Sequence, residues 1–175
     1  MKKIFVLTAL MICYFTVQAQ KEISTEKVIS IDLPKTMEKL SKQGKMLYFM
    51  KRKNSRLLSG DNYKGLTYSF EDILFQVVAD SGKLDHDRVE RTKMAEDNMN
   101  AQITDQKYSS ELLVVNKNKI VVFKREKLDY SYYEVIATNV TNNKIIVARM
   151  EYKKEDETKA KKLLDHFLKN LKFKD

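Results

Sequence analysis

The chain has little of the residues that cross-link, kink or activate a protein. Its 175 residues include one cysteine, one proline and four glycines, and they include no tryptophan. The cysteine, Cys13, lies in the N-terminal apolar segment, so the sequence after it can form no disulfide and offers no thiol nucleophile. No Pro/Gly-rich linker divides the chain. Stability must therefore come from an ordinary hydrophobic core, for which the length suffices.

Long apolar runs are also absent beyond the N-terminus. The first nineteen residues combine a positive start, Lys2 and Lys3, with an apolar run over 4–14 and a small final residue, Ala19. This pattern is typical of a secretory signal peptide, and the run is shorter than the about 20 residues that a membrane-spanning helix needs. We expect this segment to be removed, residues 20–175 to form a single globular domain without a transmembrane segment, and the protein to be periplasmic or secreted.

Cys13 offers an alternative mode of export. A lipoprotein signal has a cysteine that becomes the lipidated first residue, and the residue before it is small. Here that residue is Ile12, which is large and branched. We therefore expect cleavage after Ala19 rather than lipidation at Cys13, which leaves the mature chain without cysteine.

Acidic residues are fewer than basic ones. The chain has 33 lysines and arginines against 24 aspartates and glutamates, and losing Lys2 and Lys3 lowers the net charge from +9 to +7. Such a balance favours anionic lipid headgroups, polyanionic glycans or an acidic protein surface as partners. Export argues against nucleic acid. The alternative is that the lysines only keep the protein soluble.

The hydrophobic pattern predicts an α+β fold. Ile73–Ala79 is almost wholly apolar, as in a strand buried on both faces. Asn-rich turns at 116–118 and 141–143 are too short for anything but antiparallel neighbours. Apolar residues on both faces of the last strand indicate helices on both sides of the sheet. We predict strands at 27–33, 46–50, 66–79, 108–115, 119–125, 131–139 and 144–152, and helices at 34–43, 85–102 and 155–171.

The order of these elements resembles a known superfamily. The mature chain opens with a strand ending in SIDLP, continues through a short helix, and closes with an antiparallel meander and a long helix ending in LLDHFLKNLKF. This arrangement is similar to the Mog1/PsbP-like superfamily, which includes exported bacterial proteins related to PsbP. The tryptophan often found after the proline in that family is absent here. The resemblance implies an α/β/α sandwich with a central antiparallel sheet, and a binding or scaffolding role rather than catalysis.

Catalytic motifs are absent from the sequence. It has no Gly-rich phosphate loop, no H-E-x-x-H and no G-x-S-x-G. His86 lies between Asp85 and Asp87, but consecutive residues on a helix diverge, so we expect these aspartates to cap a helix rather than hold a metal. His166 lies off the apolar stripe of the last helix. We therefore expect no enzymatic activity, no cofactor and no metal.

Two clusters are candidates for binding. Four cations within six residues, followed by two leucines, could hold an anionic partner or a membrane surface, or form a solvated turn. Tyrosines beside cations are common at protein interfaces and carbohydrate sites, although strand tyrosines also pack across neighbours. The first cluster comprises Lys51, Arg52, Lys53 and Arg56, and the second comprises Lys124, Arg125, Tyr130, Tyr132 and Tyr133.

These observations predict an exported binding or accessory protein of the cell envelope. The expected partner is another envelope protein, which it would engage as an accessory subunit, a chaperone-like protein or an inhibitor. One alternative is a carrier of a hydrophobic or anionic small ligand, which would need an enclosed apolar cavity. A hydrolase is the third alternative, and it would need a cleft with converging polar groups.

Overall fold

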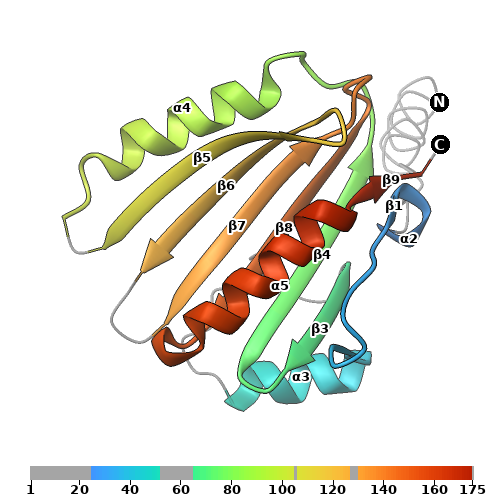
Figure 1. Cartoon of the computed structure of the whole chain (residues 1–175), viewed down its shortest axis with the longest axis vertical. Coiled ribbons are helices and arrows are strands. Elements are labelled where there is room, and N and C mark those ends of the chain that lie inside the picture. Colours follow the sequence, from blue (N-terminus) through green and yellow to red (C-terminus); the bar gives the residue numbers. More distant parts are fainter. Residues whose placement is uncertain (1–24, 52–64, 105, 127–129, 175) are drawn as a thin grey trace, which may run out of the picture.

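A seven-stranded antiparallel sheet forms the centre of the molecule (Figure 1). The computed structural model describes residues 25–51, 65–104, 106–126 and 130–174. Along the sheet the strand order is β2-β3-β4-β8-β7-β6-β5, and β1 pairs separately with β9. The strands are β1 (Ile29–Ser30), β2 (Glu38–Lys39), β3 (Leu66–Phe70), β4 (Ile73–Ser81), β5 (Lys107–Val115), β6 (Asn118–Glu126), β7 (Ser131–Thr138), β8 (Lys144–Tyr152) and β9 (Lys172–Phe173).

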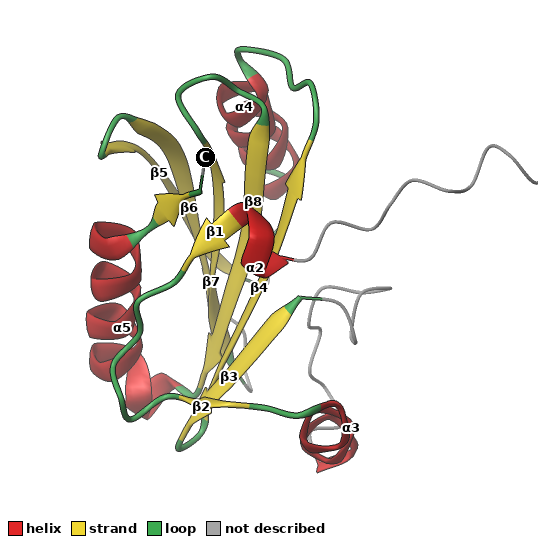
Figure 2. Cartoon of the chain, turned by 90° about the vertical axis from the view of Figure 1, so that its right-hand side faces the viewer, coloured by secondary structure: helices red, strands yellow, loops and turns green. Residues whose placement is uncertain are grey.

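Helices cover both faces of this sheet. Figure 2 shows α5 against one face, and α4 and α3 on the other side. The helices are α2 (Thr25–Val28), α3 (Lys42–Lys51), α4 (Arg88–Asn100) and α5 (Glu157–Asn170), with a short 3-10 turn at Lys154–Asp156 before α5. The predicted α+β class, with a central antiparallel sheet, helices on both faces and a long C-terminal helix, is confirmed.

The main core lies between α5 and the sheet. The rings of Phe167 on α5 and Phe75 on β4 meet edge to face, with centroids 4.9 Å apart, and both side chains are fully buried. Beside them Tyr133 stacks on Tyr152 at 5.2 Å. The stripe of α5 residues at three- and four-residue steps is buried as the sequence predicts. This packing fixes α5 across the middle strands.

A smaller core lies under α4. Val89 packs with Val121 and Phe123 of β6, and Tyr108 and Ile136 lie against them. Ile73–Ala79 is buried along almost its whole length, as expected of a strand covered on both faces. The two cores together explain why β4 and β6 carry apolar residues at successive positions.

The N-terminal third differs from the prediction. Instead of one strand, residues 27–33 form the end of α2, the two-residue β1 and an irregular segment at 31–33. The helix predicted at 34–43 and the strand predicted at 46–50 are wrong, because α3 covers 42–51. Ser41 starts it as an N-cap, since its Oγ accepts a hydrogen bond of 3.0 Å from the backbone N–H of Gly44. Gly44, the residue directly after the helix predicted at 34–43, therefore lies inside α3.

The C-terminal half agrees closely with the prediction. The four meander strands and α4 begin and end within three residues of the expected positions, and α5 within two. The segment 66–79 is two strands, because Glu71 adopts a positive φ of 49° in the turn between β3 and β4. The two-residue strand β9 was not predicted.

Candidate functional site

β5 forms an outer edge of the sheet. It pairs with β6 through nine consecutive residues, from Lys107 opposite Glu126 to Val115 opposite Asn118, without a bulge. No strand in the described part of the chain pairs with its other side. An edge strand presents unpaired N–H and C=O groups along that side. A further strand could therefore pair with β5 on its outer side.

Apolar side chains are exposed along this edge. Leu112 is 45% exposed and Val114 is 72% exposed. Because side chains alternate along a strand, both lie on the face of β5 that α4 covers. Met94 on α4 is 59% exposed. It lies three residues before Asp97, which contacts β5, so it shares that flank of the helix. The edge therefore combines free main-chain groups with an apolar strip.

The usual protections of an edge are sparse on β5. Proteins guard such strands with proline, bulges or charged residues. β5 has no proline and a regular register, and its charged residues are Lys107 and Glu111. The four residues Leu112–Val115 carry no charge. This half of the edge is therefore open to pairing.

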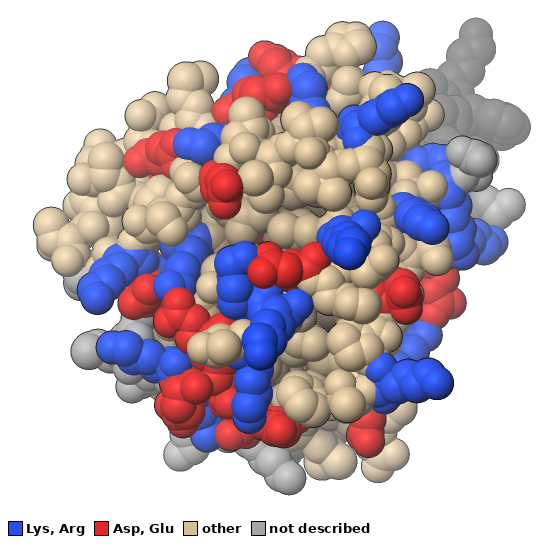
Figure 3. All heavy atoms as spheres, in the orientation of Figure 1, with Lys and Arg blue, Asp and Glu red and all other residues tan. Residues whose placement is uncertain are grey.

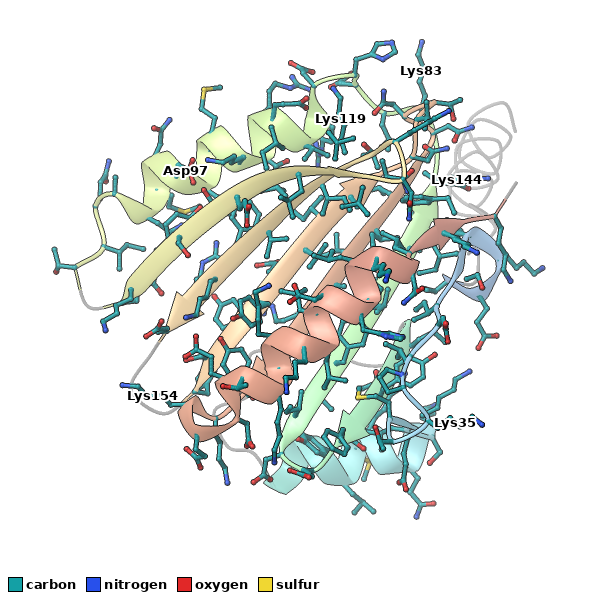
Figure 4. The ribbon with its side chains drawn as sticks, in the orientation of Figure 1. Lys35, Lys83, Asp97, Lys119, Lys144 and Lys154 are labelled. Carbon is teal, nitrogen blue, oxygen red and sulfur yellow. The ribbon has the colours of Figure 1, made fainter. Side chains whose placement is uncertain are left out.

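One carboxylate ties α4 to β5. Asp97 Oδ1 accepts hydrogen bonds from the Tyr108 hydroxyl at 2.6 Å and from Ser110 Oγ at 2.7 Å. Lys93 Nζ donates to Asp97 Oδ2 at 2.6 Å. Figure 4 shows Asp97 on the side of α4 that faces β5. These bonds, that from Lys93 foremost, lower the pKa of Asp97 from 3.8 to about 2. Helix and edge strand are therefore held in a fixed relation.

On the opposite face a groove of about 1050 Å3 separates β5 and β6 from α5. Lys124 lies in its wall and pairs with Glu157 and, at 2.7 Å, with Glu126. Partial burial lowers the pKa of Lys124, but the two carboxylates outweigh burial and raise it. The groove has apolar walls at Leu113 and Leu164, and it has both signs of charge. Its charged residues are Lys124, Lys154, Lys161, Lys162, Glu111, Glu155, Glu157 and Asp165.

The sheet divides the predicted tyrosine and cation cluster between its two faces. Lys124 and Tyr133 are opposite each other in the β6–β7 register and line the groove beside α5. Arg125 and Tyr132 are the next such pair and lie on the α4 face. Tyr130 stacks on Tyr132 with ring centroids 6.2 Å apart. The five residues therefore form two groups rather than one surface.

Arg125 is the centre of a buried ion-pair network. Its guanidinium binds Glu134 at 3.0 Å and Glu96 of α4 at 2.5 Å, and its side chain is 7% exposed. Arg149 binds the other oxygen of Glu134 at 3.2 Å. Both guanidinium groups lie over the ring of Tyr132, at 5.5 and 4.8 Å from its centroid. This geometry gives Arg125 a structural role in fixing α4 to β6.

The predicted basic loop is outside the described residues, except for its first member. Lys51 is the last residue of α3. Arg52, Lys53 and Arg56 lie outside the described ranges. The binding role of both clusters therefore stays a prediction.

The two histidines differ in their surroundings. His166 on α5 is half-buried, and its Nε2 is buried without a hydrogen-bond partner among the described residues. His86 is exposed, and its Nδ1 lies 3.1 Å from Asn142 Nδ2. Asp85 and Asp87 pair with Arg91, and Asp87 makes no side-chain cap bond, so the capping expectation is wrong. Within the described ranges, no three histidine, cysteine or acidic side chains gather as metal ligands do. No described helix has the length and hydropathy to cross a membrane.

Sequence reasoning missed the open edge at β5. The signal was present as LLVV at 112–115, an apolar run that ends a strand with polar residues at 109–111. However, hairpin turns only show that β5 neighbours β6. Which strand is outermost depends on long-range pairing of β4 with β8.

Comparison with known proteins identifies the fold. No protein-family model matches the sequence, and no curated protein matches it by sequence. The structure is similar to cyanobacterial PsbP (CyanoP) from Synechocystis sp. PCC 6803, with a TM-score of 0.54 and 11% identity over 87% of this chain and 91% of that one. It is also similar to LpqN, involved in cell envelope biogenesis of Mycobacterium tuberculosis, with a TM-score of 0.53 and 7% identity over 84% of this chain and 83% of that one. The fold is therefore PsbP-like, as the order of elements in the sequence predicts.

Proposed function

We propose that this chain is an exported, non-enzymatic accessory protein of the cell envelope that binds a protein partner by adding one of the partner's strands to β5. The open edge of β5, with Leu112 and Val114 exposed beside it, is the observation that carries the proposal. Strand addition gives affinity through main-chain hydrogen bonds and specificity through alternate side chains. A structural neighbour that is involved in cell envelope biogenesis supports the location.

The chemistry of the edge defines the partner segment. The exposed side chains of Leu112 and Val114 would contact residues at alternate positions of the added strand, so apolar residues are favoured at those positions. Exposed lysines lie at both ends of β5, Lys107 on the strand and Lys117 in the turn after it. The partner is therefore an extended, apolar segment with acidic residues near its ends, which suits the net charge of +7 expected for the mature chain.

A second copy of this chain fits the edge less well. An antiparallel pair of β5 strands centred on Glu111 places the two carboxylates opposite each other, and like charges in that position are destabilising. The net positive charge of each copy adds repulsion. A partner strand of opposite charge avoids both the repulsion between the Glu111 carboxylates and the repulsion between two positively charged chains.

The groove beside α5 does not favour a carrier of hydrophobic ligands. Such a ligand needs an enclosed, mostly apolar cavity. The groove is open to solvent, and half of the residues that line it are charged. We therefore favour the protein partner.

The test compares a variant at the edge with a variant at another exposed apolar residue. Val114→Lys places a charge in the apolar strip, whereas Met99→Lys changes a residue of α4 that is 55% exposed and lies away from Met94 around the helix. Tagged forms of wild type and both variants are purified from the native envelope, and co-purifying proteins are quantified by mass spectrometry. We expect one protein to accompany wild type and Met99→Lys, and to fall at least tenfold with Val114→Lys.

Amide hydrogen exchange then locates the contact. Adding the captured partner is expected to slow exchange at the outward-facing amides of β5 and to leave those of β3 unchanged. Equal capture by both variants, or unchanged exchange in β5, would overturn the proposal. A dimer of this chain that Val114→Lys dissociates would also overturn it, because the edge would then belong to a second copy.

A further inference from the structure

The end of the molecule that carries β9 is strongly basic. A pocket of about 750 Å3 lies there between the β5–β6 turn, the β7–β8 turn and the end of α5. Blue side chains prevail at this end in Figure 3, whereas red and blue mix over the lower left part of α5. No acidic residue lines the pocket within the described ranges. Its four lysines are Lys144, Lys169, Lys172 and Lys174.

In the part of the chain that the structure describes, no carboxylate forms an ion pair with these four lysines. Lys144 Nζ donates to the backbone carbonyl of Lys174, and Lys174 Nζ donates to that of Glu26 at 2.7 Å. Among the described residues, neither Lys169 nor Lys172 forms an ion pair. Figure 4 places Lys144 at this end of the sheet and Lys83 near it, far from Lys154 at the start of α5. Lys39 foremost, and Lys174 to a smaller extent, lower the pKa of the Glu26 carboxyl, so Glu26 offsets part of the charge of Lys174 alone. The excess of positive charge on Lys144, Lys169 and Lys172 attracts an anion.

Asparagine side chains fix the walls of the pocket. Asn139 Oδ1 accepts hydrogen bonds from the backbone N–H groups of Asn143 at 3.0 Å and Lys144 at 2.9 Å, which holds the β7–β8 turn. Asn116 Nδ2 donates to the carbonyl of Lys169 at 3.1 Å, which joins the β5–β6 turn to α5. The lysines therefore project from a fixed frame, and ammonium groups are strong donors to oxyanions.

Apolar groups accompany the cations. Val140, at the tip of the β7–β8 turn, is 62% exposed, and it lines the pocket together with Phe173, which is half-buried. An exposed apolar residue beside lysines suits the boundary between lipid headgroups and acyl chains, where lysine ammonium groups meet phosphates. A free anion has no apolar group that could contact Val140.

We propose that this pocket binds the phosphate of an anionic phospholipid headgroup, with Val140 in contact with the acyl boundary. The protein then rests on a membrane surface by its β9 end. β5 ends beside the pocket, so its apolar half, Leu112–Val115, lies nearest to the membrane surface and the rest of its open edge runs away from it. The lipid site needs no partner and stands independently of the strand addition at β5.

Vesicle binding tests the proposal. The purified protein is mixed with vesicles of phosphatidylcholine alone or with about 30% phosphatidylglycerol, and the bound fraction is measured by sedimentation at several salt concentrations. Each lysine near an anionic surface contributes about fivefold in partitioning, so Lys169→Gln with Lys172→Gln should weaken binding about thirtyfold. Lys35→Gln with Lys42→Gln makes the same charge change at exposed sites, and Lys35 lies toward the other end of the molecule in Figure 4. This control pair should weaken binding severalfold at most, and equal losses in the two double variants would overturn the proposal.

Two further measurements distinguish a phospholipid ligand from a free anion. Val140→Ser should weaken vesicle binding about fivefold and leave binding of inorganic phosphate, followed by amide chemical shifts, unchanged. If the protein binds inorganic phosphate through Lys169 and Lys172 but does not bind the anionic vesicles, the lipid assignment is overturned. Circular dichroism of each variant confirms that it is folded before binding is measured.

Discussion

The hydroxyl of Tyr108 on β5 donates a hydrogen bond of 2.6 Å to Asp97 Oδ1 on α4. Ser110, two residues along the same strand, donates to the same oxygen. Because these are residues of the outermost strand, one carboxylate joins the edge of the sheet to the helix that covers it. This anchoring would favour the strand addition that we propose at β5, since less ordering of the edge is then needed on binding.

The charge of Asp97 should make this contact pH-dependent. Replacing Asp97 with Asn keeps an acceptor oxygen but loses the charge that attracts Lys93, so we expect a loss of about 1 kcal/mol at pH 7, reduced for partial exposure. The folded pKa of about 2 lies below the ordinary 3.8. The stabilisation is therefore complete above pH 3.8 and disappears as the pH falls toward 2. Urea unfolding at pH values from 7 to 2 measures the free energy of unfolding of the wild type and of Asp97→Asn. A difference that stays constant over this range would contradict the assigned role.

Gly65 should resist substitution. Its φ is +78°, and a Cβ there would lie 2.3 Å from the backbone oxygen of Val77. We expect Gly65→Ala to destabilise the protein by at least about 2 kcal/mol, because both the backbone conformation and the space exclude a side chain. Gly82 has no atom within 4 Å of a Cβ position, so Gly82→Ala should change stability by less than about 0.5 kcal/mol. Thermal unfolding compares the two, and equal shifts would show that Gly65 is not constrained.

Arg125 should be far more sensitive than a surface arginine. Arg125→Met leaves Glu96 without its cationic partner and Glu134 with Arg149 as its only cationic partner among the described residues, so we expect a loss of about 3 kcal/mol. Arg91→Met is the matched control, because Arg91 pairs with Asp85 and Asp87 in solvent and should matter little. Guanidinium unfolding measures both variants. Near-wild-type stability of Arg125→Met would mean that the network is replaceable by apolar packing.

Phe167 should dominate the stability of the α5 layer. Phe167→Ala removes a fully buried ring that packs on Phe75, and such truncations cost about 3–5 kcal/mol. Val114→Ala removes atoms that are mostly in solvent, so its effect should stay below about 0.5 kcal/mol. Calorimetric melting temperatures distinguish the two. A large loss for Val114→Ala would show that the edge is covered in the native protein.

Local sequence patterns were sufficient for the C-terminal half of the fold. The period of two in 144–152 and the period of 3.6 in 155–171 extend over enough residues to exclude other structures. The prediction for the N-terminal third failed because most of the elements there, α2, β1 and β2, are only two to four residues long. In 46–50 an apolar run of five residues fits a strand or a helix, and the cap at Ser41 decides for the helix.

The sequence by itself determined the secondary structure of the meander and of the last helix, and the absence of disulfides and sequence motifs for catalysis. Only the tertiary structure decided that β5 is outermost, that Arg125 meets α4 whereas Lys124 meets α5, and that lysines from the start of β8, the end of α5 and the β9 segment meet in one pocket. The reason is that periodicity reports one face of one element, whereas strand order depends on pairings such as Val78 with Val147 between residues far apart in the chain.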